Sequence, residues 1–316
     1  MKRPLSPKRL LSLFGLVLFA AILAKTGPAK IAEALRGADL VAFATALGLV
    51  ALMAITKTWR WSLLLRDAGL SAPYASVLRY FLVGNFLGLA TPGRVGDFVK
   101  AFYFAGRGGN SFARASATIF VDRVLDTLVL VLLAAAILLR ERRLDVLLPV
   151  IALAAFLALL AAKRRVGERL LRRVFTAVAP GGRGERVGDE FAAFYAQTAA
   201  LLTRRRLTLP LAAAFLAYAF LVAGVSRIAA GLHLDLPLAF VAASVILAIF
   251  ASLVPISIAG LGSREAVLIA CFAQRDLPAE AAVSLSLVFL AVFYLAPAAA
   301  GALFWQLEPA RIPGKG

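Results

Sequence analysis

The sequence predicts an all-α polytopic membrane protein with six spanning helices and two re-entrant hairpins of broken helix. Hydrophobic side chains make up 62% of its 316 residues, whereas soluble domains are about half apolar. The mean hydropathy is +0.88. Six apolar runs approach the roughly 20 residues that a helix needs to cross a bilayer. Two further apolar runs lead into charged breaks that contain Gly and Pro. These observations exclude an ordinary soluble domain.

The six candidate spans cover residues 9–25, 39–56, 118–139, 144–162, 208–230 and 280–306. The first run follows a basic start and resembles a signal peptide. Cleavage after Ala24, however, would place Ile22 where a small residue is needed. We therefore expect an uncleaved first span. The apolar segments 74–90 and 237–254 run into the two breaks. The alternative is that both broken segments cross the membrane fully, which gives eight spans.

The distribution of charge predicts the topology. A net charge of +18 would suggest nucleic acid as the partner of a soluble protein. Here the basic residues lie between apolar runs, as cytoplasmic anchors do, so we expect no nucleic-acid partner. Segment 163–206 holds eleven basic and four acidic residues and is expected in the cytoplasm. The same rule places both termini there, together with the residues after the second span, which include Lys57, Arg60 and Arg66. We expect a multi-pass protein of the cell membrane.

The two breaks are similar to each other. Setting Asp97 on Glu265 aligns "LATPGRVGDFVKAFYFA" (89–105) with "SIAGLGSREAVLIACFA" (257–273) without a gap. The expected topology makes the two segments enter from opposite faces, which is the pattern of an inverted repeat. We therefore predict a single membrane domain over 1–316, with repeat halves of about 39–139 and 208–306. Spans 118–162 and the basic segment 163–206 join the halves.

The first break carries a candidate site for an anionic group. Pro92 and Gly93 interrupt the helix, because Pro lacks an N–H donor and Gly tolerates unusual backbone angles. Arg94 then lies near the start of the next helix, with Asp97 in its first turn. Free N–H groups beside a guanidinium suit a phosphate. In the alternative interpretation Arg94 and Asp97 pair and only fix the break. Asn85, on the helix that enters the break, is a further candidate.

The second break offers a comparable set of groups. Gly260 and Gly262 allow close backbone approach, and Ser263 is expected to cap the following helix. Arg264 and Glu265 supply paired charge next to that cap. Taken alone, this segment is weak evidence for a binding site. It gains weight because it repeats the pattern of the first break.

Two further candidates lie on the span 118–139. Arg123 and Asp126 are three residues apart and share a helix face. They form either a local ion pair or part of a cavity lined by the two broken helices. With one cysteine, Cys271, and one histidine, His233, the sequence offers no disulfide and no Cys-based metal site. We predict neither a metal nor a cofactor.

Three of these stretches together resemble a known family. "NFLGLATPGRVGDFVK", "RASATIFVDRVLD" and "LVPISIAGLGSREAVL" are similar to the flippase-like membrane family that includes the transmembrane region of lysylphosphatidylglycerol synthase. Asp97 stands where the family favours Glu, which keeps the charge. The resemblance implies a membrane domain that translocates or handles lipid. The synthase's soluble aminoacyl-transferring domain would follow this region, and we expect that activity to be absent from a chain that stops at Gly316.

The expected function is translocation or handling of an anionic lipid, either a phospholipid or a lipid linked to polyprenyl phosphate. Arg94 and Arg264 would hold the phosphate, while Asp97, Glu265 and Asp126 balance charge or carry a proton. One alternative is a membrane-embedded transferase that acts on a lipid-linked substrate, although the sequence shows no acidic metal motif. Another is a scaffold subunit without transport activity.

Overall fold

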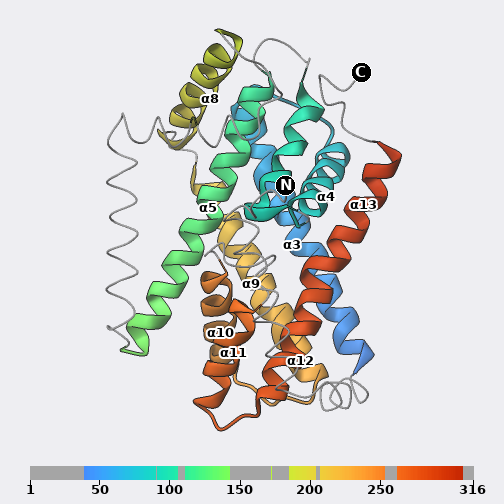
Figure 1. Cartoon of the computed structure of the whole chain (residues 1–316), viewed down its shortest axis with the longest axis vertical. Coiled ribbons are helices and arrows are strands. Elements are labelled where there is room, and N and C mark those ends of the chain that lie inside the picture. Colours follow the sequence, from blue (N-terminus) through green and yellow to red (C-terminus); the bar gives the residue numbers. More distant parts are fainter. Residues whose placement is uncertain are drawn as a thin grey trace, which may run out of the picture. The chain divides into compact units, whose positions relative to one another are not determined.

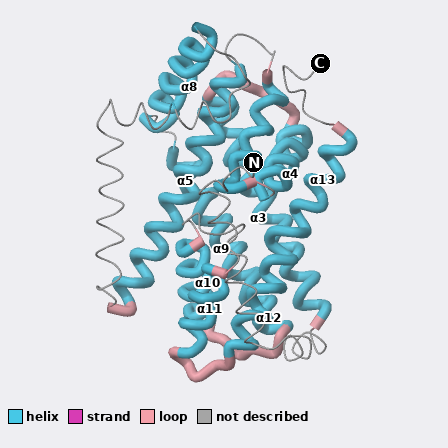
Figure 2. The backbone as a smooth tube through the Cα atoms, viewed as in Figure 1, coloured by secondary structure: helices cyan, strands magenta, loops and turns pink. Residues whose placement is uncertain are grey.

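The computed structural model describes residues 39–89, 91–105, 111–142, 172, 185–203, 207–252 and 262–308. Every regular element within these ranges is helical, which confirms the predicted all-α class (Figure 2). Three described helical stretches are long and apolar enough to cross a bilayer, namely Leu40–Asp67, Thr208–Gly231 and Ala279–Leu307. The predicted spans 9–25 and 144–162 lie outside the described residues, as does the break at 253–261. The numbers of spans and hairpins stay predictions.

The chain forms two compact units, each assembled from separate segments. The first unit comprises Met1–Ala54, Phe86–Arg94 and Leu216–Ala300. The second comprises Ile55–Asn85, Val95–Phe215 and Gly301–Gly316. Several helices therefore contribute residues to both units.

Helix α3, Leu40–Asp67, supplies its second part to the second unit (Figure 1). The sequence predicted a span that ended near residue 56, but the helix continues for another eleven residues. No Gly or Pro interrupts it after Gly48, so nothing in the backbone stops the helix where its first charges occur. It ends where the N–H of Leu70 bonds the carbonyl of Leu65 at 2.8 Å. The longer helix draws basic residues into the packed interior.

The first break lies between α4, Tyr74–Leu89, and the helix η1, Pro92–Phe104. The element after the break is a 3₁₀ helix of 13 residues and not the expected α-helix. Pro92 begins it, which is a position where a missing N–H costs little. Because side chains three residues apart eclipse each other in a 3₁₀ helix, Asp97 and Lys100 fall on one line.

Gly84 lets η1 lie close against α4. A Cβ atom at this position would lie 2.6 Å from Oδ1 of Asp97 and 3.2 Å from the Asp97 carbonyl oxygen. The first distance is shorter than side-chain packing allows and the second is unusually tight, so glycine favours this close approach. Gly84 thus fixes the depth at which the acid of the break is held.

Helix α5, Ser111–Arg140, packs along α8, Glu185–Thr203 (Figure 1). Phe120 and Phe194 meet edge to face, with ring centroids 5.9 Å apart. A buried group at this end of the unit consists of Leu64, Val121, Leu125 and Leu201. The predicted span 118–139 lies within α5, which begins seven residues earlier.

The first unit contains most of the remaining helices. It holds all of α10 (Leu238–Ala251), α11 (Ser263–Ala273), α12 (Ala279–Leu290) and the π-helical turn η3 (Ala291–Leu295). It also holds residues 216–231 of α9 (Thr208–Gly231) and residues 296–300 of α13 (Ala296–Leu307). Helix α11 contacts both α10 and α12. The core is aliphatic and aromatic and includes Val225, Val245, Leu268, Phe272 and Phe289.

Candidate functional site

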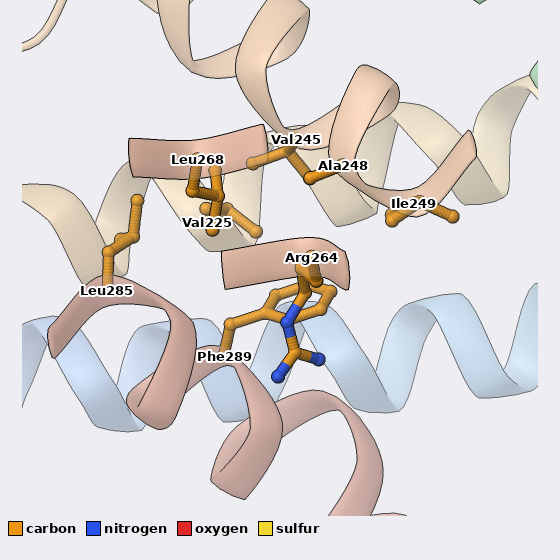
Figure 3. A pocket seen from close by; sticks show the side chains of 8 residues that line it. All are labelled: Val225, Val245, Ala248, Ile249, Arg264, Leu268, Leu285 and Phe289. Atoms are coloured by element: carbon orange, nitrogen blue, oxygen red, sulfur yellow. The ribbon is translucent and has the colours of Figure 1, made fainter. Parts of the chain in front are cut away.

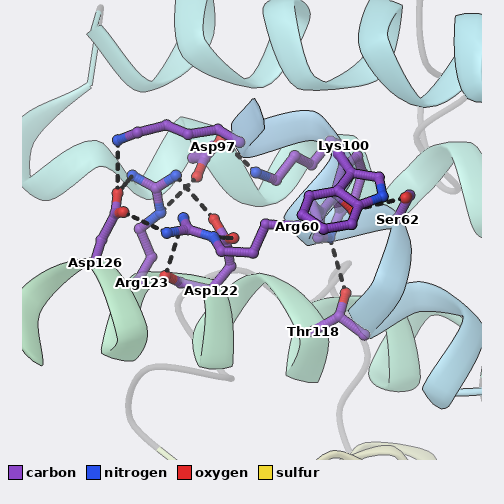
Figure 4. A network of polar contacts seen from close by, with 11 residues as sticks. Arg60, Ser62, Asp97, Lys100, Thr118, Asp122, Arg123 and Asp126 are labelled. Atoms are coloured by element: carbon purple, nitrogen blue, oxygen red, sulfur yellow. Dashed lines mark hydrogen bonds and ion pairs between the residues drawn. The ribbon is translucent and has the colours of Figure 1, made fainter. Parts of the chain in front are cut away.

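Seven charged side chains gather in the second unit, and we call them the charge cluster. They come from α3, η1 and α5, which are distant in sequence (Figure 4). The cluster consists of Lys57, Arg60, Asp97, Lys100, Asp122, Arg123 and Asp126. Charges at membrane depth are costly and are retained mainly where they pair or face a functional interior.

Arg60 forms the buried base of the cluster. Its Nε donates to Oδ1 of Asp122 at 2.7 Å, and its Nη1 donates to Oδ1 of Asp126 at 2.6 Å. The side chains of Arg60 and Asp122 are both fully buried. Because removal of either partner would take away the 2.7 Å ion-pair contact between these two buried charges, we expect this pair to help hold α3 and α5 in register.

Asp97 and Lys100 bring the first break into the cluster. The Lys100 ammonium lies 3.0 Å from Oδ1 of Asp97 and 4.7 Å from the ring centroid of Trp61. Trp61 in turn donates from Nε1 to Oγ1 of Thr118 at 3.0 Å. A lysine that is wholly buried is thus balanced by a carboxylate and by an aromatic face. These contacts tie η1 to α3 and, through Trp61, to α5.

Arg123 stands at the edge of the cluster, between Asp97 and Asp126 (Figure 4). Its Nε lies 3.3 Å from Oδ2 of Asp97, and its Nη2 donates to Oδ2 of Asp122 at 3.2 Å. Its Nη1 lies 4.0 Å from Oδ2 of Asp126, which is beyond hydrogen-bonding distance. The Arg123 side chain is 26% exposed. This guanidinium therefore keeps donor capacity on its accessible side.

Lys57 completes the same edge. Its ammonium group donates to Oδ2 of Asp126 at 2.9 Å, and the two side chains are 19% and 13% exposed. We call Lys57, Arg123 and Asp126 the open edge of the cluster. Two cations flank one carboxylate there, and all three can be reached from outside the protein core.

Some residues of the charge cluster were predicted from the sequence, and others were not. Arg123 and Asp126 were candidates, and the structure brings them together with Asp97. Lys57 and Arg60 were expected among cytoplasmic basic residues. The side of the membrane on which they lie stays a prediction, and the structure adds that Arg60 is buried and paired. The missed signal is the spacing of Lys57, Arg60 and Leu64, which places them on one face of an uninterrupted helix.

The charged residues of the second break form a smaller group in the first unit. Nη2 of Arg264 donates to Oε1 of Glu265 at 2.7 Å, and Nε donates to Oγ of Ser286 at 2.7 Å. Ser286 donates to the same Glu265 oxygen at 2.5 Å. All three residues are buried. The pair is therefore balanced in charge and is bound to α12.

Aromatic and aliphatic side chains surround this group. The guanidinium carbon of Arg264 lies 5.2 Å from the ring centroid of Phe289 and 5.9 Å from that of Tyr294. Arg264 also lines a small pocket that is otherwise apolar, with Leu268, Leu285 and Phe289 among its walls (Figure 3). The apolar surroundings strengthen the attraction between Arg264 and Glu265.

Gly262 begins α11 in place of the predicted cap, Ser263. Gly262 has a φ of +89° and occupies the N-cap position, while Ser263 is the first helical residue. Oε2 of Glu265 accepts the N–H of Gly262 at 2.5 Å. The prediction was wrong because this backbone conformation favours glycine, and the acid three residues on supplies the cap from inside the helix. Gly260 lies outside the described residues.

The other predicted site residues lie near the first break. Asn85 is half-buried in α4, and Pro92 and Gly93 are the first two residues of η1. Arg94 is exposed and has a φ of +57°, a left-handed conformation that is uncommon for residues other than glycine. The backbone turns at Arg94 itself, so the break is a sharp local feature.

The sequence is similar to those of known membrane proteins. The family model of the lysylphosphatidylglycerol synthase TM region matches residues 9–301. A UPF0104 membrane protein from Methanothermobacter thermautotrophicus is 32% identical over 127 residues. That match covers 40% of this chain and 38% of the relative, so it spans well under half of either protein. Because the family model covers nearly the whole sequence, the chain belongs to the family of the lysylphosphatidylglycerol synthase transmembrane region.

Proposed function

We propose that this membrane protein translocates an anionic lipid, with a phosphate group of the lipid bound at the open edge of the charge cluster. The observation that carries the proposal is the position of Arg123. Its guanidinium contacts the buried carboxylates of Asp97 and Asp122, and its side chain is 26% exposed. Its Nη1 lies 4.0 Å from Oδ2 of Asp126. A phosphate oxygen is a strong acceptor for such a donor.

The buried part of the cluster gives this arrangement its rigidity. Arg60 and Lys100 are wholly buried and paired with carboxylates. The acidic partners of Arg123 are therefore held in place, and they fix the position of its guanidinium. Preorganised donors bind a charged group without the cost of ordering long side chains at the moment of binding. The proposed roles of Asp97 and Asp126 are to orient Arg123 and to balance its charge when no lipid is bound.

The residues of the two breaks receive different proposed roles. Asn85 and Arg94 belong to the segments that flank the first break, and their part in binding an anion stays a prediction from the sequence. Arg264 has its charge balanced by Glu265 at 2.7 Å. Both side chains are buried, so an incoming anion has no access to Arg264, and we assign Arg264, Glu265 and Gly262 to holding the start of α11. The sequence interpretation of Arg264 as a phosphate ligand is thereby replaced by a positioning role.

The test is lipid translocation in liposomes that contain the purified full chain. Tail-labelled phosphatidylglycerol and phosphatidylcholine serve as anionic and zwitterionic probes, and the loss of label to a membrane-impermeant reductant reports the crossing rate. We expect faster crossing of phosphatidylglycerol than in protein-free liposomes. Arg123→Gln should slow this about tenfold, as expected for the loss of one charge-assisted contact of about 1.4 kcal/mol.

Arg66→Gln is the matched control, because Arg66 is an exposed arginine at the end of α3. It should leave the rate unchanged. The proposal is refuted if the wild-type protein does not accelerate phosphatidylglycerol or a polyprenyl phosphate probe, or if Arg123→Gln transports both as fast as the wild type. A polyprenyl phosphate rate above the phosphatidylglycerol rate would identify the second lipid class as the substrate.

A further inference from the structure

We infer that Asp126 is a built-in substitute for the lipid phosphate, and that the phosphate binds by replacing it between Lys57 and Arg123. This inference rests on the proposed function, since it names the groups that the lipid headgroup would engage at the open edge. It adds Lys57 as a second phosphate-binding residue and gives Asp126 the role of an internal competitor.

The geometry around one oxygen atom of Asp126 supports this exchange. Oδ2 of Asp126 lies 2.9 Å from Nζ of Lys57 and 4.0 Å from Nη1 of Arg123. A carboxylate oxygen thus sits between two cations that come from different helices, α3 and α5. A phosphate carries several acceptor oxygens and can engage both cations at hydrogen-bonding distance, whereas this oxygen lies within that distance of Lys57 but 4.0 Å from Nη1 of Arg123. The Asp126 carboxylate is therefore too far from Arg123 to form a hydrogen bond with it through Nη1.

Asp126 would remain paired after it gave up this position. Its other oxygen, Oδ1, accepts from Nη1 of Arg60 at 2.6 Å, and Arg60 is fully buried. If the phosphate took over Lys57 and Arg123, the carboxylate would still hold its 2.6 Å contact with the buried Arg60. The exchange therefore does not leave an isolated charge, which would be the main cost of entry at membrane depth.

The members of the charge cluster differ in accessibility. The side chains of Lys57, Arg123 and Asp126 are 19%, 26% and 13% exposed. Their neighbours Arg60, Asp122 and Lys100 are fully buried, and Asp97 is nearly so. The exchange is thus confined to the three residues that can be reached from outside. Among the described members of the cluster, only Asp126 is accessible and also contacts both the buried Arg60 and the partly exposed Lys57.

Competition from the Asp126 carboxylate would help to release the lipid. A phosphate held between two cations in an apolar environment would dissociate slowly, which would limit turnover. Asp126 lowers the net affinity, because it regains Lys57 when the phosphate leaves. Its removal should therefore strengthen binding of the anionic lipid, while a purely structural carboxylate would not have this effect.

The test is equilibrium binding of phosphatidylglycerol to the detergent-solubilised full chain, measured by native mass spectrometry. We expect Asp126→Asn to raise the affinity about tenfold and Lys57→Gln to lower it about tenfold. The double variant should return to within about threefold of the wild type. Glu141→Gln removes an exposed acid just after the end of the same helix, α5, and should not change the affinity.

Melting temperatures of all variants establish that they are folded. If Asp126→Asn does not fold, Asp126→Glu replaces it, and the longer carboxylate should leave the affinity for phosphatidylglycerol within about threefold of the wild type. An unchanged or weaker affinity in folded Asp126→Asn overturns the inference, as does unchanged binding in folded Lys57→Gln. An Asp126→Glu affinity outside the stated range also overturns it. Binding that follows the expected pattern without transport in liposomes would refute the proposed function and leave this inference standing.

Discussion

Arg60 donates from Nε to Oδ1 of Asp122 across 2.7 Å, and neither side chain is exposed. The two residues belong to α3 and α5, and their contact is the deepest link between these helices in the charge cluster. A buried ion pair of this kind is costly to form and still more costly to break on one side only. Its main contribution is to fix which faces of α3 and α5 meet.

Arg60→Leu should therefore destabilise the protein by about 3–5 kcal/mol, because Asp122 would remain charged and buried without its main partner. The measurement is the midpoint of unfolding in detergent. Arg66→Leu, at an exposed position on the same helix, should change stability little. The double variant Arg60→Leu with Asp122→Leu should recover part of the loss. A fully stable single variant would contradict the role of this pair.

Gly84→Ala should push η1 away from α4, because the new methyl group would lie 2.6 Å from Oδ1 of Asp97. Overpacking of this kind costs about 1–3 kcal/mol, seen as a lower melting temperature. Gly48→Ala is the matched control, since no atom lies within 4 Å of a Cβ at that helical position. The control should be neutral or stabilising by up to about 1 kcal/mol. Equal effects of the two substitutions would show that the close approach is unimportant.

Ser286→Ala should remove the hydroxyl that links Arg264 to Glu265 in the first unit. Loss of a hydrogen bond to buried charged groups costs about 1–3 kcal/mol. Ser284, two residues earlier on α12, is equally buried, and its Oγ has no hydrogen-bond partner within the described part of the chain. Ser284→Ala should accordingly be neutral or slightly stabilising. Thermal unfolding of both variants separates these expectations, and an effect larger at Ser284 than at Ser286 would contradict them.

Glu190 gives the fold a pH dependence outside the spanning helices. Burial against α5 raises the pKa of its carboxyl, and the backbone N–H of Ala113 opposes this only in part. The neutral acid favours the folded state, so this contribution is complete at low pH and is lost as pH rises through the folded-state pKa. Glu190→Gln should raise the melting temperature above that pKa and leave it unchanged at acidic pH.

The control for this titration is Asp189→Asn, at the adjacent exposed position of α8. It should not change the difference in melting temperature between acidic and neutral pH. If both variants shift the profile equally, the cause is the net charge of α8 and not the burial of Glu190.

The sequence allowed several parts of this structure to be predicted. Apolar runs identified the helices, because length and hydropathy decide whether a segment can lie in a bilayer. Asp97, Arg123 and Asp126 were identified because ionisable residues in apolar helices rarely lack a role. The extent of α3 was predicted incorrectly, since charges at residues 57 and 60 resemble the end of a span. Partners on a distant helix make such charges tolerable, and one sequence gives no direct sign of those partners.

The geometry of the breaks was also beyond sequence reasoning. A Pro-Gly pair predicts an interruption, but it does not distinguish an α-helix from the 3₁₀ helix that follows. That difference aligns Asp97 with Lys100. At the second break, Ser263 has the side chain of a typical helix cap, yet the positive φ of Gly262 and the reach of Glu265 determine where α11 begins.

The pairing of Arg60 with Asp122 also constrains how the protein is made. The two residues are 62 positions apart, so at about 5–20 residues per second the ribosome completes Asp122 roughly 3 to 12 seconds after Arg60. Throughout this interval Lys57 and Arg60 have no access to the carboxylates of α5. The basic residues of nascent α3 can reach their buried pairing only after α5 has been synthesised. Assembly of the charge cluster therefore follows the order of synthesis, and α5 is the segment that completes it.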